Sequence, residues 1–466
     1  MKVSAKTTLV AAVTVAAVML LSGESGAVRA GETGAPAALE GLDELDLATA
    51  REVAVSNNPS LSAARRSVEA ARARVGQALS RYWPRIDASL TMSRVDQSDV
   101  DYAQNAAMSS FFNPGSRPDD PETYYTAGLQ ATWLLFDGLA REFNMAAARH
   151  GVDSGEQARK DAQRQLLSAV ADAFHNARLA RENVGIAQAD AAFYSRLADD
   201  ARARRRIGTG SLSDVLNFEV QVNSARAQVL QAEDGYRAAR HGLAALMGLA
   251  GSTLPPGLDI AALGPSSEDR LDVPDADPLV EFARRHRPDV LGQMAAVRAA
   301  ESSYKAARSG FLPTLNLSAS YEGQRSDDLD FRSDDFGSTV AVTLSYNVFA
   351  GGLTLSRMRE AEVERNRSGD QLENVALTAA REVRVAHSAL RRAREEVLLQ
   401  RENARLVERN RDLVEKEYNA GQATLVRLNE AQRNLTAARG RLASARVSLG
   451  RAWHNLMTAS GKVLTP

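Results

Sequence analysis

Two short stretches of the chain each combine a glycine with a hydroxyl side chain three positions later. They are "RRRIGTGSLSDVL", which begins at Arg204, and "EKEYNAGQATLVRL", which begins at Glu415. A glycine can leave a helix with a positive φ angle, and a serine or threonine can cap the helix that follows. The spacing therefore predicts that Gly208 and Gly421 end one helix each, and that Ser211 and Thr424 begin the next.

The residue spacings that catalysis or metal binding requires are missing. The chain has no cysteine, so it has no disulfide, no thiolate zinc site and no cysteine nucleophile. It also has no HExxH pattern and no glycine-rich phosphate loop with its lysine. The histidines are scattered, and each is expected on a helix surface; they are His150, His175, His241, His286, His387 and His454. We therefore expect no enzyme, no cofactor and no metal.

The charge balance also excludes a class of partner. The formal net charge of the 466 residues is −1, whereas a nucleic-acid-binding protein needs a basic excess. The run "RARRR" that ends at Arg206 is explained by the preference of arginine for the C-terminus of a helix. No nucleic-acid partner is expected.

The N-terminus has the features of a secretory signal peptide. Lysines precede an apolar run from Leu9 to Leu21, and Val28 and Ala30 lie at the −3 and −1 positions of a cleavage site. Residues 1–30 are therefore predicted to be removed on export, with an uncleaved anchor as the alternative. No later segment reaches the roughly 20 apolar residues of a spanning helix, so any membrane insertion must use strands.

The chain is one unit copied once. The landmark pairs are Pro59 and Pro288, Pro84 and Pro313, Phe136 and Phe349, and Gly208 and Gly421. The first two pairs share one separation and the last two share a smaller one, so the second copy is shorter in a single place between Pro84 and Phe136. We expect a first repeat over 31–250, a linker over 251–277, a second repeat over 278–460 and a tail over 461–466.

Within each copy, apolar and polar residues first alternate and then follow a helical period. The alternation predicts strands at about 85–95 and 123–137, and again at about 314–324 and 338–350, with a polar loop inside each pair. Their length suits tilted membrane strands, and the aromatic residues near their ends suit an interfacial girdle. A soluble, half-buried hairpin would alternate in the same way.

Long helices are predicted after each strand pair, at about 138–205 and 352–417. At a rise of 1.5 Å per residue each would extend about 100 Å. Apolar residues recur every seven positions, which indicates supercoiled packing; they include Val170, Ala177, Val184, Ala191 and Ala198, then Val383, Leu390, Val397 and Ala404. Tips at 206–211 and 418–424 would connect these helices to return helices at 212–250 and 424–458.

These features together resemble the TolC-like outer-membrane efflux family of trimeric channel-tunnels, from about Leu47 to Lys462. The resemblance rests on "NPSLSAAR" at Asn58, "WPRI" at Trp83, "LFDGLAR" at Leu135 and "GTGSLSDVL" at Gly208, each with a counterpart in the second copy. It implies a mostly α fold with a membrane β-barrel, in which three chains close twelve strands and continue them as a periplasmic α-helical barrel. Four strands alone would leave open edges in lipid.

The resemblance also implies a function and its partners. The chain would be a passive export channel in the outer membrane of a Gram-negative bacterium, extending into the periplasm. It would serve a tripartite efflux pump or a type I secretion system, and it would open when an adaptor and pump engage its periplasmic tip. The implied partners are two further copies of the chain, a periplasmic adaptor, an inner-membrane pump of the RND or ABC type, and outer-membrane lipid.

Site residues follow from the same resemblance. The adaptor-contacting tip would comprise Ile207, Gly208 and Thr209 in the first copy, and Ala420, Gly421 and Gln422 in the second. Asp214 and Tyr418 match linked positions of the closed gate, and Glu430 matches one position of an acidic ring. Arg427 stands where the other ring acid usually sits, and Gln422 where an arginine often does. Arg427 pairing with Glu430 is therefore an alternative closed-state contact.

Two rival functions share some of these features. A periplasmic coiled-coil adaptor also has long alanine-rich hairpins, although normally one per chain and without paired amphipathic strands. A rod that scaffolds the envelope without a pore is the other rival. The cargo stays open among drugs, metal ions and polypeptides.

Overall fold

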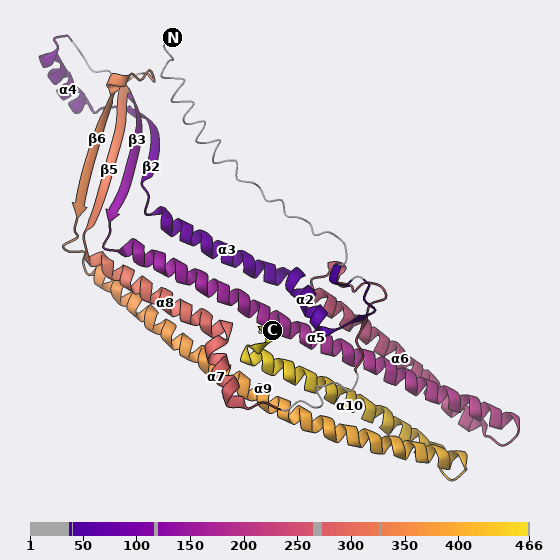
Figure 1. Cartoon of the computed structure of the whole chain (residues 1–466). Helices are drawn as coiled ribbons and strands as arrows, with labels where there is room; N and C mark the ends of the chain where they lie inside the picture. The colour runs from indigo at the N-terminus through magenta and orange to yellow at the C-terminus, as the bar shows by residue number, and fades with distance from the viewer. Residues whose placement is uncertain (1–36, 40, 116–119, 264–272, 327, 465–466) are drawn as a thin grey trace. The chain divides into compact units, whose positions relative to one another are not determined.

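The computed structural model describes residues 37–39, 41–115, 120–263, 273–326 and 328–464 (Figure 1). The predicted signal peptide, residues 1–30, lies outside them. The chain forms two compact units, which we describe separately. The first contains Ala73–Arg149 and Ala299–Arg365, and the second contains Glu32–Arg72, His150–Arg298 and Asn366–Pro466.

The first unit contains a four-stranded antiparallel sheet in the order β2-β3-β5-β6 (Figure 1). Its strands are β2 (Arg85–Val95), β3 (Glu122–Phe136), β5 (Thr314–Ser326) and β6 (Phe336–Ser345). The two copies therefore contribute one strand pair each, and β3 joins β5 at the centre. Strands β2 and β6 are the open edges.

One face of this sheet is apolar and the other is polar. Opposite residues of paired strands point to the same face. One row across the sheet reads Ile86, Ala131, Ala319 and Val340, whereas the next row reads Asp87, Gln130, Ser320 and Thr339. The apolar face is uncovered in the single chain, since Ile86 is 70% exposed and Val340 is 72% exposed.

The sheet differs from the sequence prediction in two places. The loop after β2 contains a helix, α4 (Asp99–Phe112), because the Ser98 hydroxyl caps it by accepting a hydrogen bond from the Asp101 amide at 3.2 Å. Strand β6 ends at Ser345 rather than near 350. Thr314, the first residue of β5, pairs with Ser345, so the residues after Ser345 have no partner in the sheet.

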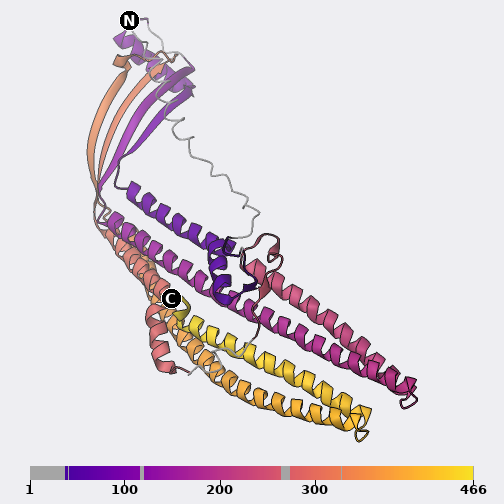
Figure 2. The ribbon, with the colours of Figure 1, turned by 45° about the vertical axis from the view of Figure 1, so that its right-hand side comes forward.

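The helices form two long hairpins, α5 with α6 and α9 with α10, whose members lie side by side in both ribbon views (Figures 1 and 2). Their bounds are α5 (Ala140–Arg206), α6 (Leu212–Leu246), α9 (Leu353–Asn419) and α10 (Leu425–Ser460). The shorter helices are α2 (Leu47–Asn57), α3 (Pro59–Ser80), α7 (Ala276–His286) and α8 (Pro288–Arg308). In the described part of the chain, no helix has the length and hydropathy needed to cross a membrane.

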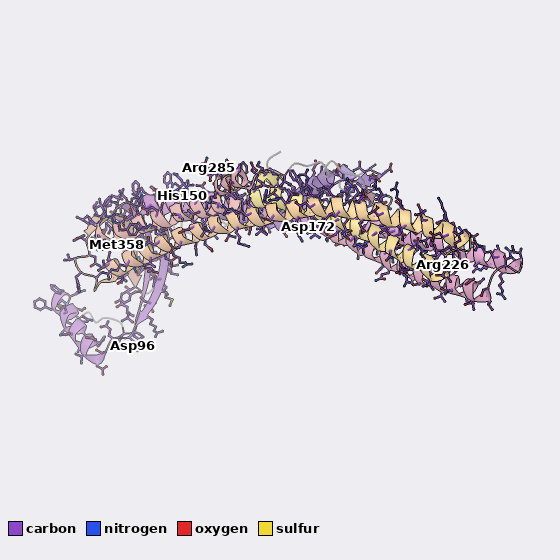
Figure 3. The ribbon with its side chains drawn as sticks, turned by 90° about the horizontal axis from the view of Figure 1, so that it is seen from below. Asp96, His150, Asp172, Arg226, Arg285 and Met358 are labelled. Atoms are coloured by element: carbon purple, nitrogen blue, oxygen red, sulfur yellow. The ribbon has the colours of Figure 1, made fainter. Side chains whose placement is uncertain are left out.

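Three apolar clusters form the core of the second unit. One packs α2 on α5 and α6, another packs α7 on α9 and α10, and a third joins the two hairpins near their turns. The predicted heptad seam is confirmed in part: Val170, Ala177 and Ala198 are buried, whereas Val184 and Ala191 are half-buried. Charged side chains such as Arg226 on α6 and Arg285 on α7 lie exposed at the surface (Figure 3).

Two features of the second unit were not predicted: a pair of short strands and a buried histidine. Within the expected linker, β4 (Asp259–Ile260) pairs in parallel with β1 (Glu44–Leu45). His175 is only 2% exposed, so placing every histidine on a helix surface was wrong. Its ring packs 5.3 Å from the ring of His454, and burial lowers the pKa of His175 to about 3, which keeps it neutral.

Gly248 gives a direct test of this packing. Its φ is +72°, and a Cβ atom built there would lie 2.6 Å from the Asn57 carbonyl oxygen. Gly257 has a φ of +88° and nothing within 4 Å of such a Cβ. We expect Gly248→Ala to cost about 3 kcal/mol of stability and Gly257→Ala only about 1 kcal/mol, because the second has backbone strain alone. Equal shifts of the thermal unfolding midpoint would contradict this packing.

Candidate functional site

The turn between α5 and α6 closes with a paired hydrogen-bond motif. The Gly208 amide donates to the Arg205 carbonyl at 3.0 Å, and the Thr209 amide donates to the Arg204 carbonyl at 2.9 Å. Gly208 has a φ of +83°, a backbone conformation that residues other than glycine rarely adopt. This is the Schellman arrangement that satisfies the last carbonyls of a helix.

The turn between α9 and α10 repeats this arrangement in the second copy. The Gly421 amide donates to the Tyr418 carbonyl at 3.0 Å, the Gln422 amide donates to the Glu417 carbonyl at 2.8 Å, and Gly421 has a φ of +73°. The predicted caps are confirmed, because Ser211 accepts from the Ser213 amide and Thr424 accepts from the Arg427 amide. The two copies therefore build the same turn.

Both turns are open to solvent. Ile207 is 75% exposed, and a Cβ atom added at Gly208 or Gly421 would meet nothing within 4 Å. The remaining predicted tip residues, Thr209, Ala420 and Gln422, are exposed as well. All six predicted tip residues are thus accessible to a partner.

Tyr418 lies against the first hairpin. Its ring meets the Phe218 ring edge-on, with centroids 6.4 Å apart, and the Arg204 guanidinium carbon lies 5.6 Å from the Tyr418 centroid. The Arg204 Nη2 atom also donates to the Asn419 Oδ1 atom at 3.0 Å. One aromatic side chain of the second hairpin is therefore held by two residues of the first.

The charge of Asp214 reaches Tyr418. Burial raises the pKa of the Tyr418 hydroxyl, and the Asp214 carboxylate raises it further, while Arg204 opposes both effects. Asp214 is half-buried in the first turn of α6. This electrostatic effect links two predicted gate residues that lie on different hairpins.

The other two predicted gate residues, Arg427 and Glu430, both lie on α10. Arg427 is exposed and pairs with Glu417 across its own turn, with 3.1 Å between Arg427 Nη1 and Glu417 Oε2. The structure therefore differs from the alternative pairing of Arg427 with Glu430. Glu430 is exposed on α10.

Behind the turns, a buried carboxylate joins the hairpins. Asp190 on α5 is 7% exposed, and its Oδ1 atom accepts hydrogen bonds from Gln432 Nε2 at 2.7 Å and Thr436 Oγ1 at 2.9 Å. Neighbouring Tyr194 is also buried, and burial raises its pKa to about 12. Because both donors come from α10, this contact ties the first repeat to the second.

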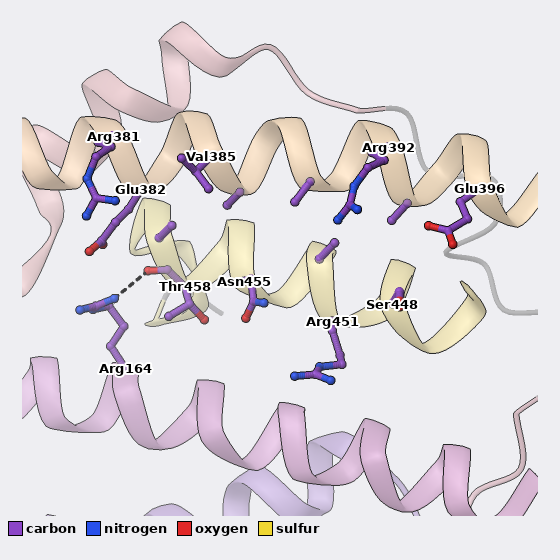
Figure 4. Close-up of a pocket in the computed structure, with 15 residues that line it drawn as sticks. Arg164, Arg381, Glu382, Val385, Arg392, Glu396, Ser448, Arg451, Asn455 and Thr458 are labelled. Carbon is purple, nitrogen blue, oxygen red and sulfur yellow. Dashed lines mark hydrogen bonds between the residues drawn. The ribbon is translucent and has the colours of Figure 1, made fainter. Parts of the chain in front are cut away.

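A groove of about 690 Å³ lies among α5, α9 and α10 (Figure 4). Four arginines line it: Arg164, Arg381, Arg392 and Arg451. Arg164 donates to the Thr458 carbonyl at 3.1 Å, and Arg451 Nε lies 2.9 Å from Asp172 Oδ1. These two arginines therefore connect α5 with α10. Among the described residues, no group of three histidine or acidic side chains is placed to hold a metal ion.

The sequence interpretation missed three of the residues that build this region. Arg204 appeared only as part of a basic run at a helix end, and neither Phe218 nor Asp190 was singled out. Their partners lie in the other copy, far away along the chain, so no local spacing pointed to these contacts.

Known proteins share both the sequence pattern and the fold. The family model described as "Outer membrane efflux protein" matches residues 50–249 and 279–462. The outer membrane efflux protein BepC of Brucella suis is 28% identical over 420 residues, covering 88% of this chain and 84% of BepC. The alkaline protease secretion protein AprF of Pseudomonas aeruginosa is 26% identical over 426 residues, covering 90% of this chain and 84% of AprF. A solved structure of CusC superposes with a TM-score of 0.75 at 19% identity, covering 90% of this chain and 92% of CusC.

Proposed function

Because the chain belongs to the outer membrane efflux protein family, we propose that it is a passive export channel for a tripartite efflux pump or a type I secretion system. The family match over both repeats carries this proposal. Its relatives include an efflux protein, BepC, and a protein of protease secretion, AprF. The chain lies in the outer membrane and extends into the periplasm, and we assign it no catalytic step of its own.

We assign the channel to a trimer. The sheet has two open edges and an uncovered apolar face, and four strands are too few to close on themselves. The helices have uncovered apolar stripes as well. On α9, Leu399, Leu406 and Leu413 recur at heptad spacing and are 71%, 53% and 59% exposed.

A matching stripe follows α6, where Leu212, Leu216 and Val220 are 48%, 52% and 63% exposed. Apolar residues at such spacing support packing against further helices. In the proposed trimer, neighbouring copies cover both stripes, and three sheets supply twelve strands.

We further propose that the two glycine turns receive a periplasmic adaptor and that the residues beside them form the gate. Tyr418 and Asp214 hold the closed state, Arg427 and Glu430 add charge around the entrance, and an inner-membrane pump supplies the energy. The exposure of the turns and the contact of Tyr418 with the first hairpin support this assignment. Each of the repeats at 31–250 and 278–460 then contributes one helical hairpin to the entrance.

The stripe on α9 tests the trimer. Replacing Leu399, Leu406 and Leu413 with glutamine is expected to abolish the heat-resistant trimer band on a denaturing gel, because it places polar groups in a packed seam. Arg409→Gln, an exposed change on the same helix, should leave the band intact. Trimers as heat-resistant as those of the parent protein would contradict the assignment.

Extraction of the unmodified protein from the cell envelope distinguishes the proposed channel from the two rival functions, an adaptor and a scaffolding rod. We expect it to leave the envelope only with detergent and to migrate as a trimer. An adaptor without strands in the membrane, or a scaffolding rod, would instead be released into aqueous buffer by osmotic shock.

A further inference from the structure

Arg204 takes part in both the first turn and the contact with Tyr418. Its carbonyl accepts hydrogen bonds from the Thr209 amide at 2.9 Å, the Gly210 amide at 3.1 Å and the Thr209 hydroxyl at 3.2 Å. Its guanidinium reaches the second hairpin, where it contacts the Tyr418 ring and the Asn419 side chain. We propose that Arg204 couples the adaptor-contacting turn to the gate; this inference rests on the proposed function.

Arg204 is distinct from the arginines around it. Arg202 pairs within the first hairpin, with Asp199 at 2.8 Å and Glu219 at 2.9 Å. Arg205 and Arg206 are exposed, and no contact from either to the second hairpin is found in the described chain. The helix dipole explains why cations gather at the end of α5, but it does not explain why one of them reaches across to Tyr418.

In the described part of the second copy, the residue at the corresponding position of the turn makes no such bridge. Glu417 occupies the position that corresponds to Arg204, and its carbonyl likewise accepts from the Gln422 and Ala423 amides. The Glu417 carboxylate, however, pairs with Arg427 of the same hairpin. The backbone motif is therefore shared by the two copies, whereas at this position of the motif the described chain shows a side-chain bridge to the other hairpin only from Arg204.

This geometry gives a route from the turn to the gate. A partner that binds Gly208 and Thr209 competes for the Thr209 amide, which donates to the Arg204 carbonyl. Because the same residue carries the guanidinium, a change in the turn shifts the side chain away from Tyr418 and Asn419. The closed arrangement then loses the hydrogen bond and the cation–π contact together.

Single-channel recording in planar bilayers tests the bridge, with Arg205→Gln as the matched control. We expect Arg204→Gln to raise the open probability of isolated trimers about tenfold, because it removes one hydrogen bond and one cation–π contact. Arg204→Lys should have an intermediate effect, since it keeps a cation near the ring and loses the planar fork. Arg204→Gln channels that behave like Arg205→Gln channels would overturn the proposal.

The coupling itself needs a double-mutant comparison. Gly208→Val strains the turn, so it should raise the open probability when Arg204 is present and add little in Arg204→Gln channels. Fully additive effects would overturn the coupling. A heat-resistant trimer band for each variant establishes that the protein is folded and assembled.

One reference variant separates this inference from the gate assignment. If Asp214→Ala with Tyr418→Ala opens the channel and Arg204→Gln does not, the role of Arg204 is refuted and the gate assignment stands. If neither opens the channel, both are refuted.

Discussion

Replacing Asp214 and Tyr418 together with alanine is expected to raise the single-channel conductance of purified trimers several-fold. Tyr418 packs edge-on against Phe218 and lies beneath the Arg204 guanidinium, and alanine removes both contacts. Such aromatic and cation–π contacts contribute about 1 to 2 kcal/mol together. In the proposed trimer, three copies act on one entrance, so the closed state loses this stabilisation three times.

The control for this prediction changes charge near the same turns without touching Tyr418. Asp200→Ala combined with Lys416→Ala alters two exposed residues and should keep the parent conductance. If the gate variant and this control conducted equally, Asp214 and Tyr418 would not hold the channel closed.

Export is expected to fall below about a tenth of the parent level when Gly208 or Gly421 is replaced by valine, while trimers persist. A β-branched residue at φ values of +83° or +73° costs about 1 to 2 kcal/mol and distorts the turn. Both glycines are exposed with free space around them, so the loss should fall on partner docking rather than on folding.

This second prediction is measured in cells that lack the natural gene, by comparing export with the amount of heat-resistant trimer. Gly257→Val is the matched control, because Gly257 also has a positive φ and free space but lies outside both turns. Normal export by both tip variants would show that the glycine turns are not the docking surface.

The local periods of the sequence predicted the hairpins and the strand pairs well. Alternation places Ile86 on the apolar face of its own strand and Val340 on the apolar face of its own strand, and neither placement depends on which strand lies beside it. A glycine followed by a capping hydroxyl ends one helix and begins the next through hydrogen bonds between residues close in sequence. Helix α4 could also have been anticipated, since Ser98 precedes acidic residues in the manner of a helix start.

Contacts between the two copies could not be predicted in this way. Tyr418 meets Arg204 and Phe218, and Asp190 meets Gln432, only after both hairpins have formed and packed. The partner of Arg427 was missed for a related reason. The short turn directs the first residues of α10 back toward the end of α9, which favours Glu417 over Glu430.

The central claim is that several copies of this chain pool their strands to make one pore through the outer membrane. The most direct measurement is the current through a planar lipid bilayer after addition of the purified mature protein. We predict stepwise increases of current from particles with the mass of three chains. A monomer that stays in aqueous solution and leaves the bilayer non-conducting would contradict the claim.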